Sequence, residues 1–127
     1  LAIRDGRRLY AALPWRDPGR QEYSIQSHWG LPYANFGLLS RELFLRLGGF
    51  DPRYVTYAAD TDIAFEVWRA GGHVLAVPGA AVDHLRAPDG MRGWNERRIE
   101  RDSAAFNEKW LDVELCGRVR HSSRRAP

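Results

Sequence analysis

Two glycine pairs constrain the fold of this chain more than any other feature. Gly48-Gly49 and Gly71-Gly72 each follow a segment with helical periodicity. Glycine in such a place lets the backbone take the left-handed conformation that ends a helix. We therefore expect one helix to begin after Ser40, a favourable N-cap residue, and to end at the first pair. A second helix should begin near residues 60–62, whose two carboxylates suit a helix N-terminus, and end at the second pair.

Short extended segments and a third helix complete the pattern. The apolar run at residues 34–39 contains a glycine, which predicts a buried segment whose backbone lies close to a neighbour. We expect a short strand or helix near residues 9–13, a loop or short strand at 24–33, a short buried strand at 73–77 and another extended segment at 80–84. A helix should run over 93–111, with Ile99, Phe106 and Trp110 on one face and charged residues on the other. This mixture of helices and short strands predicts an α/β or α+β class.

Length and composition agree with one globular unit. The chain has 127 residues, of which 44% are hydrophobic, and it contains no run of about 20 apolar residues that would predict a membrane helix. Cys116 is the single cysteine, so an intrachain disulfide or a cysteine-based zinc site is excluded. We expect Cys116 to be a small apolar residue near a helix end.

The charge pattern gives little support for nucleic-acid binding. The net charge is +3, and Lys109 is the only lysine among 19 basic residues. Acidic residues are interspersed among the arginines except near the C-terminus, where residues 116–127 predict a basic, flexible tail. Among the function classes that we consider for this sequence, an arginine-rich nucleic-acid binder therefore has the weakest support. We expect no nucleic-acid partner.

The ordered motifs from Ser40 to His84 carry the strongest functional signal. They resemble the C-terminal half of the catalytic domain of glycosyltransferase family 2, whose members are inverting enzymes with the GT-A fold. The resemblance covers about residues 30–111. The matching pieces are Arg41-Glu42, Gly48-Gly49-Phe50-Asp51, Asp60-Thr61-Asp62, Arg69-Ala70-Gly71-Gly72, Val77-Pro78, His84, and the closing set Asp102, Phe106, Lys109 and Trp110. The resemblance implies a partial GT-A-like, Rossmann-like α/β domain. This part would be the acceptor-side half, with three helices and a few short strands.

The resemblance assigns the catalytic base to Asp60. Inverting glycosyl transfer needs a base that takes the proton of the acceptor hydroxyl, and the family has an Asp at this place, preceded by a Glu. Here Ala59 stands at the Glu position. We expect Asp62 and Asp51 to be supporting residues: Asp62 should bind backbone amides or Arg69, and Asp51 should cap a turn.

Three further residues are candidates for ligand contacts. In resembling enzymes a His at the place of His84 lies near the metal and the donor diphosphate, although a lone His is more often a structural side chain. Trp29 and Tyr33 lie where the family shapes the acceptor pocket, and flat aromatic faces suit sugar rings. Plain packing accounts for these two aromatic residues equally well.

The resemblance also implies parts that the sequence does not contain. The family binds a nucleotide-sugar donor and a divalent cation, Mg²⁺ or Mn²⁺, on an N-terminal half, and no such half precedes Leu1. Leu1 is not a methionine, and we expect a cut end there. We therefore predict a truncated N-terminal segment at 1–23, an acceptor and catalytic-base half at 24–115, and the tail at 116–127.

Several expectations about activity follow from this division. The chain should be an inactive fragment of an enzyme of the cytoplasm, including the inner face of the membrane, and should bind no cation by itself. The acceptor would be a carbohydrate or a lipid-linked sugar, with polysaccharide biosynthesis as one role. An apolar face left by the missing half would favour a homodimer.

The alternative to an enzyme fragment is a non-catalytic remnant or interaction module on the same scaffold, which Ala59 favours.

Overall fold

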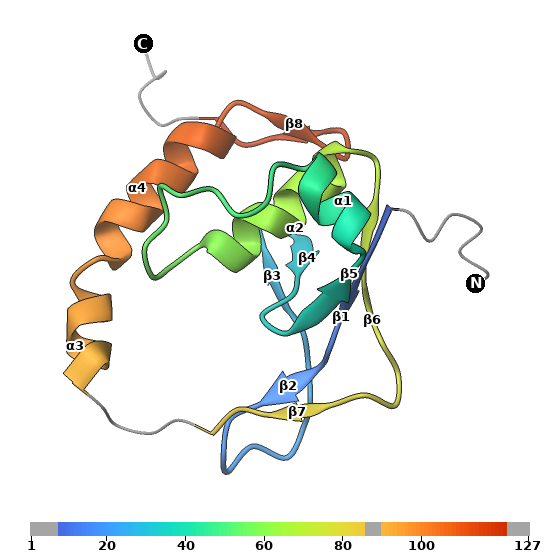
Figure 1. The fold of residues 1–127 in the computed structure, drawn as a ribbon, viewed down its shortest axis with the longest axis vertical. Helices are drawn as coiled ribbons and strands as arrows, with labels where there is room; N and C mark the ends of the chain where they lie inside the picture. The colour runs from blue at the N-terminus through green and yellow to red at the C-terminus, as the bar shows by residue number, and fades with distance from the viewer. Residues whose placement is uncertain (1–7, 86–89, 122–127) are drawn as a thin grey trace.

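A computed structural model of the chain describes residues 8–85 and 90–121. The fold is a mixture of small sheets and four helices in this part of the chain (Figure 1). In chain order the elements are β1 (Leu9–Ala12), β2 (Trp15–Arg16), β3 (Gln26–His28), β4 (Leu31–Tyr33), β5 (Gly37–Leu39), α1 (Arg41–Arg46), α2 (Ala59–Arg69), β6 (His73–Ala76), β7 (Val82–Asp83), α3 (Gly90–Glu96), α4 (Ile99–Trp110), β8 (Glu114–Leu115) and β9 (Arg118–Val119).

The central sheet has three strands in the order β5-β1-β6. Strand β1 is antiparallel to β5 and parallel to β6. Residues 9–12, which lie inside the predicted N-terminal segment 1–23, therefore supply the middle strand of this sheet. The predicted division at residue 23 stays a prediction. Of β6 only Val74 is buried, so the prediction of a buried strand at 73–77 is wrong for its other residues. The physical reason is that β6 lies at an edge of this small sheet, where fewer neighbours cover it.

Gly37 confirms the predicted close backbone approach. A Cβ atom at this position would lie 2.6 Å from the ring of Tyr10 and 2.8 Å from the carbonyl oxygen of Ala11. Both contacts are with strand β1, which pairs with β5 at this register. The glycine therefore lets β5 lie against the buried Tyr10 ring.

The pairing of β1 with β6 continues into a second parallel pair, β2 with β7. Between the two pairs the Val77 amide donates to the Ala12 carbonyl, at 2.9 Å. At the far end the His84 amide donates to the Arg16 carbonyl, also at 2.9 Å. Residues that are about 65 positions apart in the chain are thus held side by side, as the lower part of Figure 1 shows.

Helix α1 forms where the sequence predicts it. The Ser40 hydroxyl accepts a hydrogen bond of 3.1 Å from the Leu43 amide, which is N-cap geometry. At the other end Gly48 and Gly49 have φ angles of 89° and 72°, and the Gly49 amide donates to the Phe44 carbonyl at 2.9 Å. The predicted glycine stop is therefore confirmed.

Helix α2 lies at the centre of the molecule and joins two apolar clusters. Ile63, Ala64 and Val67 belong to the cluster formed with the central sheet. Phe65 belongs to the second cluster, which includes Phe106 and Trp110 of α4. Because α2 is buried from Thr61 through Val67, its position fixes the residues at its N-terminus firmly.

The predicted third helix is two helices, α3 and α4. Arg98, the residue before α4, has no side-chain capping bond, and its guanidinium carbon lies 3.6 Å from the centre of the Trp94 ring. The buried face of α4 consists of Asp102, Phe106 and Trp110. Ile99, which the sequence places on the same face as Phe106 and Trp110, is 39% exposed, because the buried residues of α4 begin only at Asp102.

The C-terminal part of the described chain is a hairpin. Cys116 and Gly117 form the turn between β8 and β9 with φ angles of 52° and 75°. Cys116 is exposed there, not at a helix end as predicted, because such a turn points its side chains to solvent. The turn and β9 of this hairpin lie inside residues 116–127, the segment predicted as a flexible tail, of which residues 122–127 lie outside the described part. No helix in the described residues has the length and apolarity needed to span a bilayer.

Candidate functional site

A cavity of about 550 Å³ opens between the N-terminus of α2 and the strands. Asp60, Tyr33 and His84, three of the residues singled out in the sequence, line it together. The remaining lining residues are Trp15, Gln26, Asn35, Phe36, Phe50, Thr56, Tyr57, Ala58, Ala59 and Thr61. We call this space the Asp60 cavity.

Asp60 is held at both carboxylate oxygens. Oδ2 accepts a hydrogen bond of 2.9 Å from Nδ2 of Asn35, and Oδ1 accepts one of 2.8 Å from the Thr61 amide. The amide oxygen of Asn35 in turn accepts a hydrogen bond of 2.9 Å from Nε1 of Trp15. A carboxylate oxygen can accept more than one hydrogen bond, so Asp60 is oriented and still able to accept a proton from a ligand.

Backbone geometry also contributes to the orientation of Asp60. The N-cap of α2 is Ala58, which has a left-handed φ of 67° and no side-chain capping bond. Asp60 is therefore not the cap of this helix, because it already lies inside its first turn. There the helix dipole favours its negative charge. Ala59 lines the same cavity, so no carboxylate stands next to Asp60 at that position.

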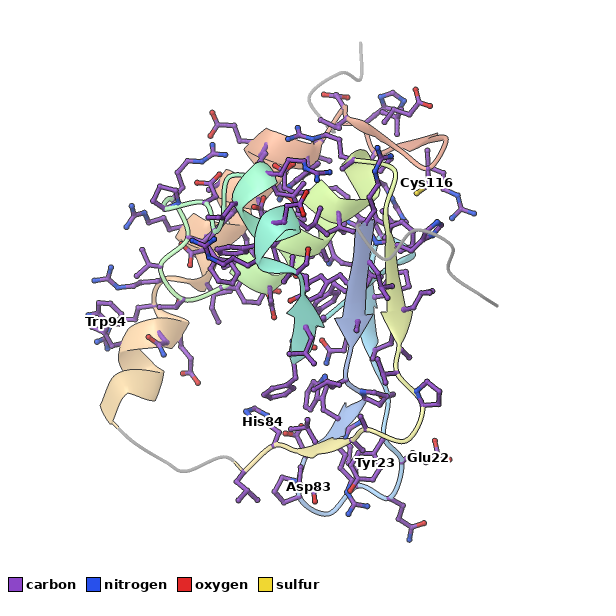
Figure 2. All side chains as sticks on the ribbon, turned by 45° about the vertical axis from the view of Figure 1, so that its right-hand side comes forward. Glu22, Tyr23, Asp83, His84, Trp94 and Cys116 are labelled. Carbon is purple, nitrogen blue, oxygen red and sulfur yellow. The ribbon has the colours of Figure 1, made fainter. Side chains whose placement is uncertain are left out.

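His84 lies across the cavity at the end of β7. Its Nδ1 is 3.3 Å from Oδ1 of Asp17, and its ring packs edge-on against Trp15 and Phe36. The neighbouring Asp83 points to the other side of the strand (Figure 2). There it accepts hydrogen bonds of 2.7 Å from Arg16 and 2.9 Å from Tyr23. This alternation is what an extended segment imposes, and it leaves His84 as the side chain of this strand that reaches the cavity.

Asp62 does not reach the cavity. It is 1% exposed and accepts hydrogen bonds of 3.0 Å from the Tyr54 hydroxyl and 2.8 Å from Trp110 Nε1. Lys109 Nζ lies 2.9 Å from it. The predicted contact with Arg69 is wrong: Arg69 is further along α2 and pairs with Glu66.

Lys109 is the centre of this buried charge network. Its ammonium lies 2.9 Å from Glu66 and 3.4 Å from Asp51, in addition to Asp62. Burial alone would lower the pKa of Lys109, but the hydrogen bonds to Asp62 and Glu66 raise it above the usual range of a lysine. Lys109 is thus charged, and it joins α4 to α2 behind the cavity.

Asp51 has the capping role that the sequence predicts. Its carboxylate accepts hydrogen bonds of 3.0 Å from the Arg53 amide and 2.9 Å from the Arg53 guanidinium. These bonds, together with Lys109, hold the pKa of Asp51 well below its usual range despite the opposing effect of burial. Asp51 is a structural residue of the loop between α1 and α2, not a lining residue of the cavity.

Another acidic residue with a structural role, Asp102 of α4, positions the loop that precedes Asp60. It is fully buried, and its Oδ2 accepts three consecutive backbone amides, those of Val55, Thr56 and Tyr57, at 3.1, 2.8 and 2.8 Å. Although burial would raise the pKa of Asp102, these three bonds hold it below the usual range. The loop that they fix supplies Thr56, Tyr57 and Ala58 to the cavity wall.

The two predicted aromatic residues line different spaces. Tyr33 lines the Asp60 cavity and donates a short hydrogen bond to Gln26. Trp29 instead lines a second space of about 280 Å³, which Tyr33 also borders. The Trp29 ring packs against Phe65 and Phe106 of the second apolar cluster, so it has a packing role whatever else it contacts.

Sequence reasoning missed Trp15 and Asn35, which hold Asp60. They lie 45 and 25 positions before Asp60, and no motif marks Trp15. Asn35 is a polar residue inside the apolar run 34–39, which is a weak signal that an amide is needed there. Asp102 appeared only as part of a family pattern, and no local pattern indicates that its partner is a loop 46 residues earlier.

Curated proteins similar to this chain are glycosyltransferases. The chain is 30% identical over 80 residues to N-acetylgalactosaminyltransferase 7 of Drosophila melanogaster, an alignment covering 62% of the chain and 12% of that protein. It is 32% identical over 56 residues to the human protein of that name, covering 43% and 8%. It is 34% identical over 76 residues to N-acetylglucosaminyl-diphospho-decaprenol L-rhamnosyltransferase of Mycobacterium tuberculosis, covering 58% and 25%.

These alignments are partial. The chain spans between 8% and 25% of the length of these three relatives. No protein-family profile matches the chain, and no solved structure matches it. The similarity therefore supports a sugar transferase and gives no single sugar, since the relatives' names specify N-acetylgalactosamine in two cases and rhamnose in the third.

Proposed function

We propose that this chain is the acceptor and catalytic-base half of an inverting glycosyltransferase domain of the family 2 type. The observation that carries the proposal is the Asn35–Asp60 pair: an oriented carboxylate at a helix N-terminus, inside a cavity, in a chain whose relatives transfer sugars. The donor-binding half, with its nucleotide-sugar site, belongs to the complete enzyme. A cytoplasmic location with a carbohydrate or lipid-linked acceptor completes the proposal.

In this proposal Asp60 acts as the general base. The acceptor hydroxyl donates a hydrogen bond to an Asp60 oxygen, and its own oxygen attacks the anomeric carbon of the donor. The bond from that carbon to the diphosphate oxygen breaks, and its electron pair leaves with the nucleoside diphosphate. The hydroxyl proton passes to Asp60. A single displacement from the face opposite the leaving group inverts the anomeric configuration.

Asn35, Trp15 and Thr61 orient the base before the acceptor arrives. Fixed hydrogen bonds to both oxygens restrict rotation of the carboxylate, which lowers the entropy that must be lost to reach a reactive geometry. Tyr33 and Tyr57 border the space where an acceptor would lie. Because Asp62 and Asp51 are saturated by Lys109, Arg53 and Trp110, they support the scaffold and are not alternative bases.

The divalent cation of the proposed complete enzyme does not fit the described residues by themselves. Among these residues no group of three or more His, Cys, Asp or Glu side chains is arranged to hold a metal ion. His84 beside Asp17 offers an imidazole and a carboxylate at one edge of the cavity, which is short of a coordination shell. We therefore assign no step to a cation here, and we propose His84 as a contact to the metal or the diphosphate only in the complete enzyme.

The test is transfer by the full-length protein and its Asp60→Asn variant, screened against a nucleotide-sugar panel with Mg²⁺ or Mn²⁺. The variant should lose transfer and keep donor binding, measured by calorimetry. Asp83→Asn is the matched control, because that carboxylate lies on the opposite side of β7 in an exposed pair with Arg16. Turnover retained in Asp60→Asn would refute the base assignment. The 127-residue chain by itself should show no transfer.

A non-catalytic interaction module on the same scaffold is the second candidate. One observation favours it: Ala59 leaves Asp60 without the adjacent carboxylate that the resembling family has. This module would bind a glycan without turning it over. Absence of transfer from every nucleotide-sugar by the full-length protein, with retained glycan binding, would select it over the enzyme.

A further inference from the structure

The second space beside the Asp60 cavity differs from it in chemistry. It has a volume of about 280 Å³ and is bordered by β3, β4, the loop before α2, and α4. Four residues, Tyr33, Tyr57, Ala58 and Thr61, line both spaces. We call the second space the α4 cavity. Its position one wall away from Asp60 makes it relevant to any ligand whose hydroxyl group Asp60 contacts.

The α4 cavity has an aromatic floor. The rings of His28 and Trp29 are stacked with centres 5.0 Å apart, and Phe106 packs edge-on against both, at 5.2 and 5.5 Å. Polar groups lie among these rings: the side chains of Thr61, Ser103 and Asn107 border the same space. Flat rings together with hydroxyl and amide groups match a sugar ring, which has apolar C–H faces and a polar rim.

Among the described residues, none that lines the α4 cavity is an acid, an arginine or a lysine. The one titratable group near neutrality is His28, and burial, together with the positive charge of Arg120, lowers its pKa. A phosphate or carboxylate would therefore find no counter-charge in the wall. The volume of about 280 Å³ lies just below the range of roughly 300–1,000 Å³ found for small-molecule sites, so it suits a single ring.

Two of the four non-glycine residues with left-handed φ angles in the described part of the chain border this cavity. Trp29 and Ala58 both line it, and both have left-handed φ angles, 51° and 67°. Trp29 is the first residue of the two-residue turn between β3 and β4, where glycine, asparagine or aspartate is favoured. A bulky residue is disfavoured in that conformation, and such backbone geometry recurs at ligand sites.

We propose that the α4 cavity binds a neutral sugar ring, namely the non-reacting unit of an acceptor that contains at least two sugars. The inference rests on the proposed function for the identity of the reacting hydroxyl. Thr61 links the two spaces, because it lines both and its amide contacts Asp60 Oδ1 at 2.8 Å. The reacting sugar then lies at Asp60, and the next sugar lies over His28, Trp29 and Phe106.

The test uses saturation-transfer NMR on the full-length protein with methyl lactoside, methyl cellobioside and methyl maltoside as neutral probes. Ser103→Phe would fill the cavity from α4, at a half-buried position of the wall. Ala104→Phe is the matched control, since Ala104 is the adjacent, exposed residue outside the lining. We expect at least one disaccharide to bind, and its affinity to fall about tenfold or more in Ser103→Phe alone, as expected when ring stacking is lost.

Three results would overturn the inference. They are no saturation transfer from any of the three disaccharides, equal affinities in the Ser103→Phe and Ala104→Phe variants, or binding of decanol that is blocked by Ser103→Phe while no disaccharide competes. Because this readout needs no turnover, it is separate from the test of Asp60. If Asp60→Asn remained active while Ser103→Phe blocked sugar binding, the base assignment would fail and the sugar subsite would stand.

Discussion

The side-chain amide of Asn35 donates a 2.9 Å hydrogen bond to the carboxylate of Asp60, and the same amide accepts a bond from the indole of Trp15. This relationship connects the strand side of the molecule with the N-terminus of α2. It gives Asp60 one orientation, which a general base needs. It also makes the proposed chemistry testable at a residue that would not itself accept the proton.

Replacing Asn35 by alanine should lower kcat for transfer by about tenfold to a hundredfold, because a slightly misplaced base reacts much more slowly. Donor binding should change little, since Asn35 contacts the base and not a charged ligand group. Steady-state kinetics of the full-length protein measures both. Trp15→Phe is the comparison: it removes the outer hydrogen bond and keeps an aromatic ring beside Phe36 and His84, and it should have a smaller effect. A wild-type kcat in Asn35→Ala would contradict the positioning role.

Replacing Lys109 by methionine should destabilise the fold by about 3 kcal/mol, since removing one partner leaves buried carboxylates uncompensated. The affected groups are Asp62 and Glu66, each 2.9 Å from the ammonium. The free energy of unfolding in urea measures the effect. The Arg46–Glu42 pair offers a matched control on an exposed surface, and Arg46→Ala should cost no more than about 0.5 kcal/mol. Equal losses in the two variants would show that the Lys109 network is not a buried one.

Stability should fall in acid because of Asp51. Its pKa is held below the usual range in the folded protein by Arg53 and Lys109, so its contribution is present above the unfolded-state pKa and is lost as the pH falls toward the folded-state value. Asp51→Asn should make the dependence of unfolding free energy on pH shallower below about pH 4, by up to about 1.4 kcal/mol per pH unit. Glu42→Gln, at an exposed position, is the comparison. An unchanged acid slope in Asp51→Asn would count against this account.

Stability should also fall at alkaline pH because of Lys109. Its pKa is raised in the folded protein, so its contribution is complete below the unfolded-state pKa of about 10.4 and is lost as the pH rises through the folded-state value. Chemical denaturation at alkaline pH should therefore show a decline in wild type that is smaller in Lys109→Met. The same decline in both proteins would assign the alkaline loss to other groups.

Removing the Asp102 carboxylate should loosen the loop that borders both cavities. Asp102→Ala leaves the amides of Val55, Thr56 and Tyr57 without their acceptor, and we expect a loss of about 2–4 kcal/mol. Asp102→Asn keeps one side-chain oxygen and should lose less. Hydrogen exchange at these three amides measures the local effect. Exchange rates unchanged in Asp102→Ala would show that the loop is held by other contacts.

Gly37→Ala should destabilise the fold by about 1–3 kcal/mol, because the added methyl would overlap Tyr10 and the β1 backbone. Gly93→Ala is the matched control: it lies within α3 with no atom within 4 Å of its new Cβ, and it should stabilise the helix by roughly 0.5–1 kcal/mol. Thermal unfolding of the two variants gives the comparison. Tolerance of alanine at Gly37 would show that β5 can move away from β1 at low cost.

Much of the local structure could be predicted because its causes are local. Ser40 and the glycine pairs set both ends of α1 and the C-terminal end of α2 through their own backbone preferences and hydrogen bonds. The close approach at Gly37 was predictable because a glycine within an apolar run commonly marks a place where a neighbouring backbone leaves no room for a side chain. The break between α3 and α4 and the exposure of Ile99 were not, since they depend on which surface of the core α4 can reach.

The sequence by itself determined both ends of α1, the C-terminal end of α2, the α/β class, and the resemblance that singles out Asp60 and His84. Only the tertiary structure decided what each acidic residue does. Asp60 faces a cavity because Asn35 reaches it across 25 residues, while Asp62, two positions later, is turned into the core and saturated by Lys109, Tyr54 and Trp110. The physical reason is that a carboxylate's role depends on burial and on its hydrogen-bond donors, and these donors come from segments that only folding brings together.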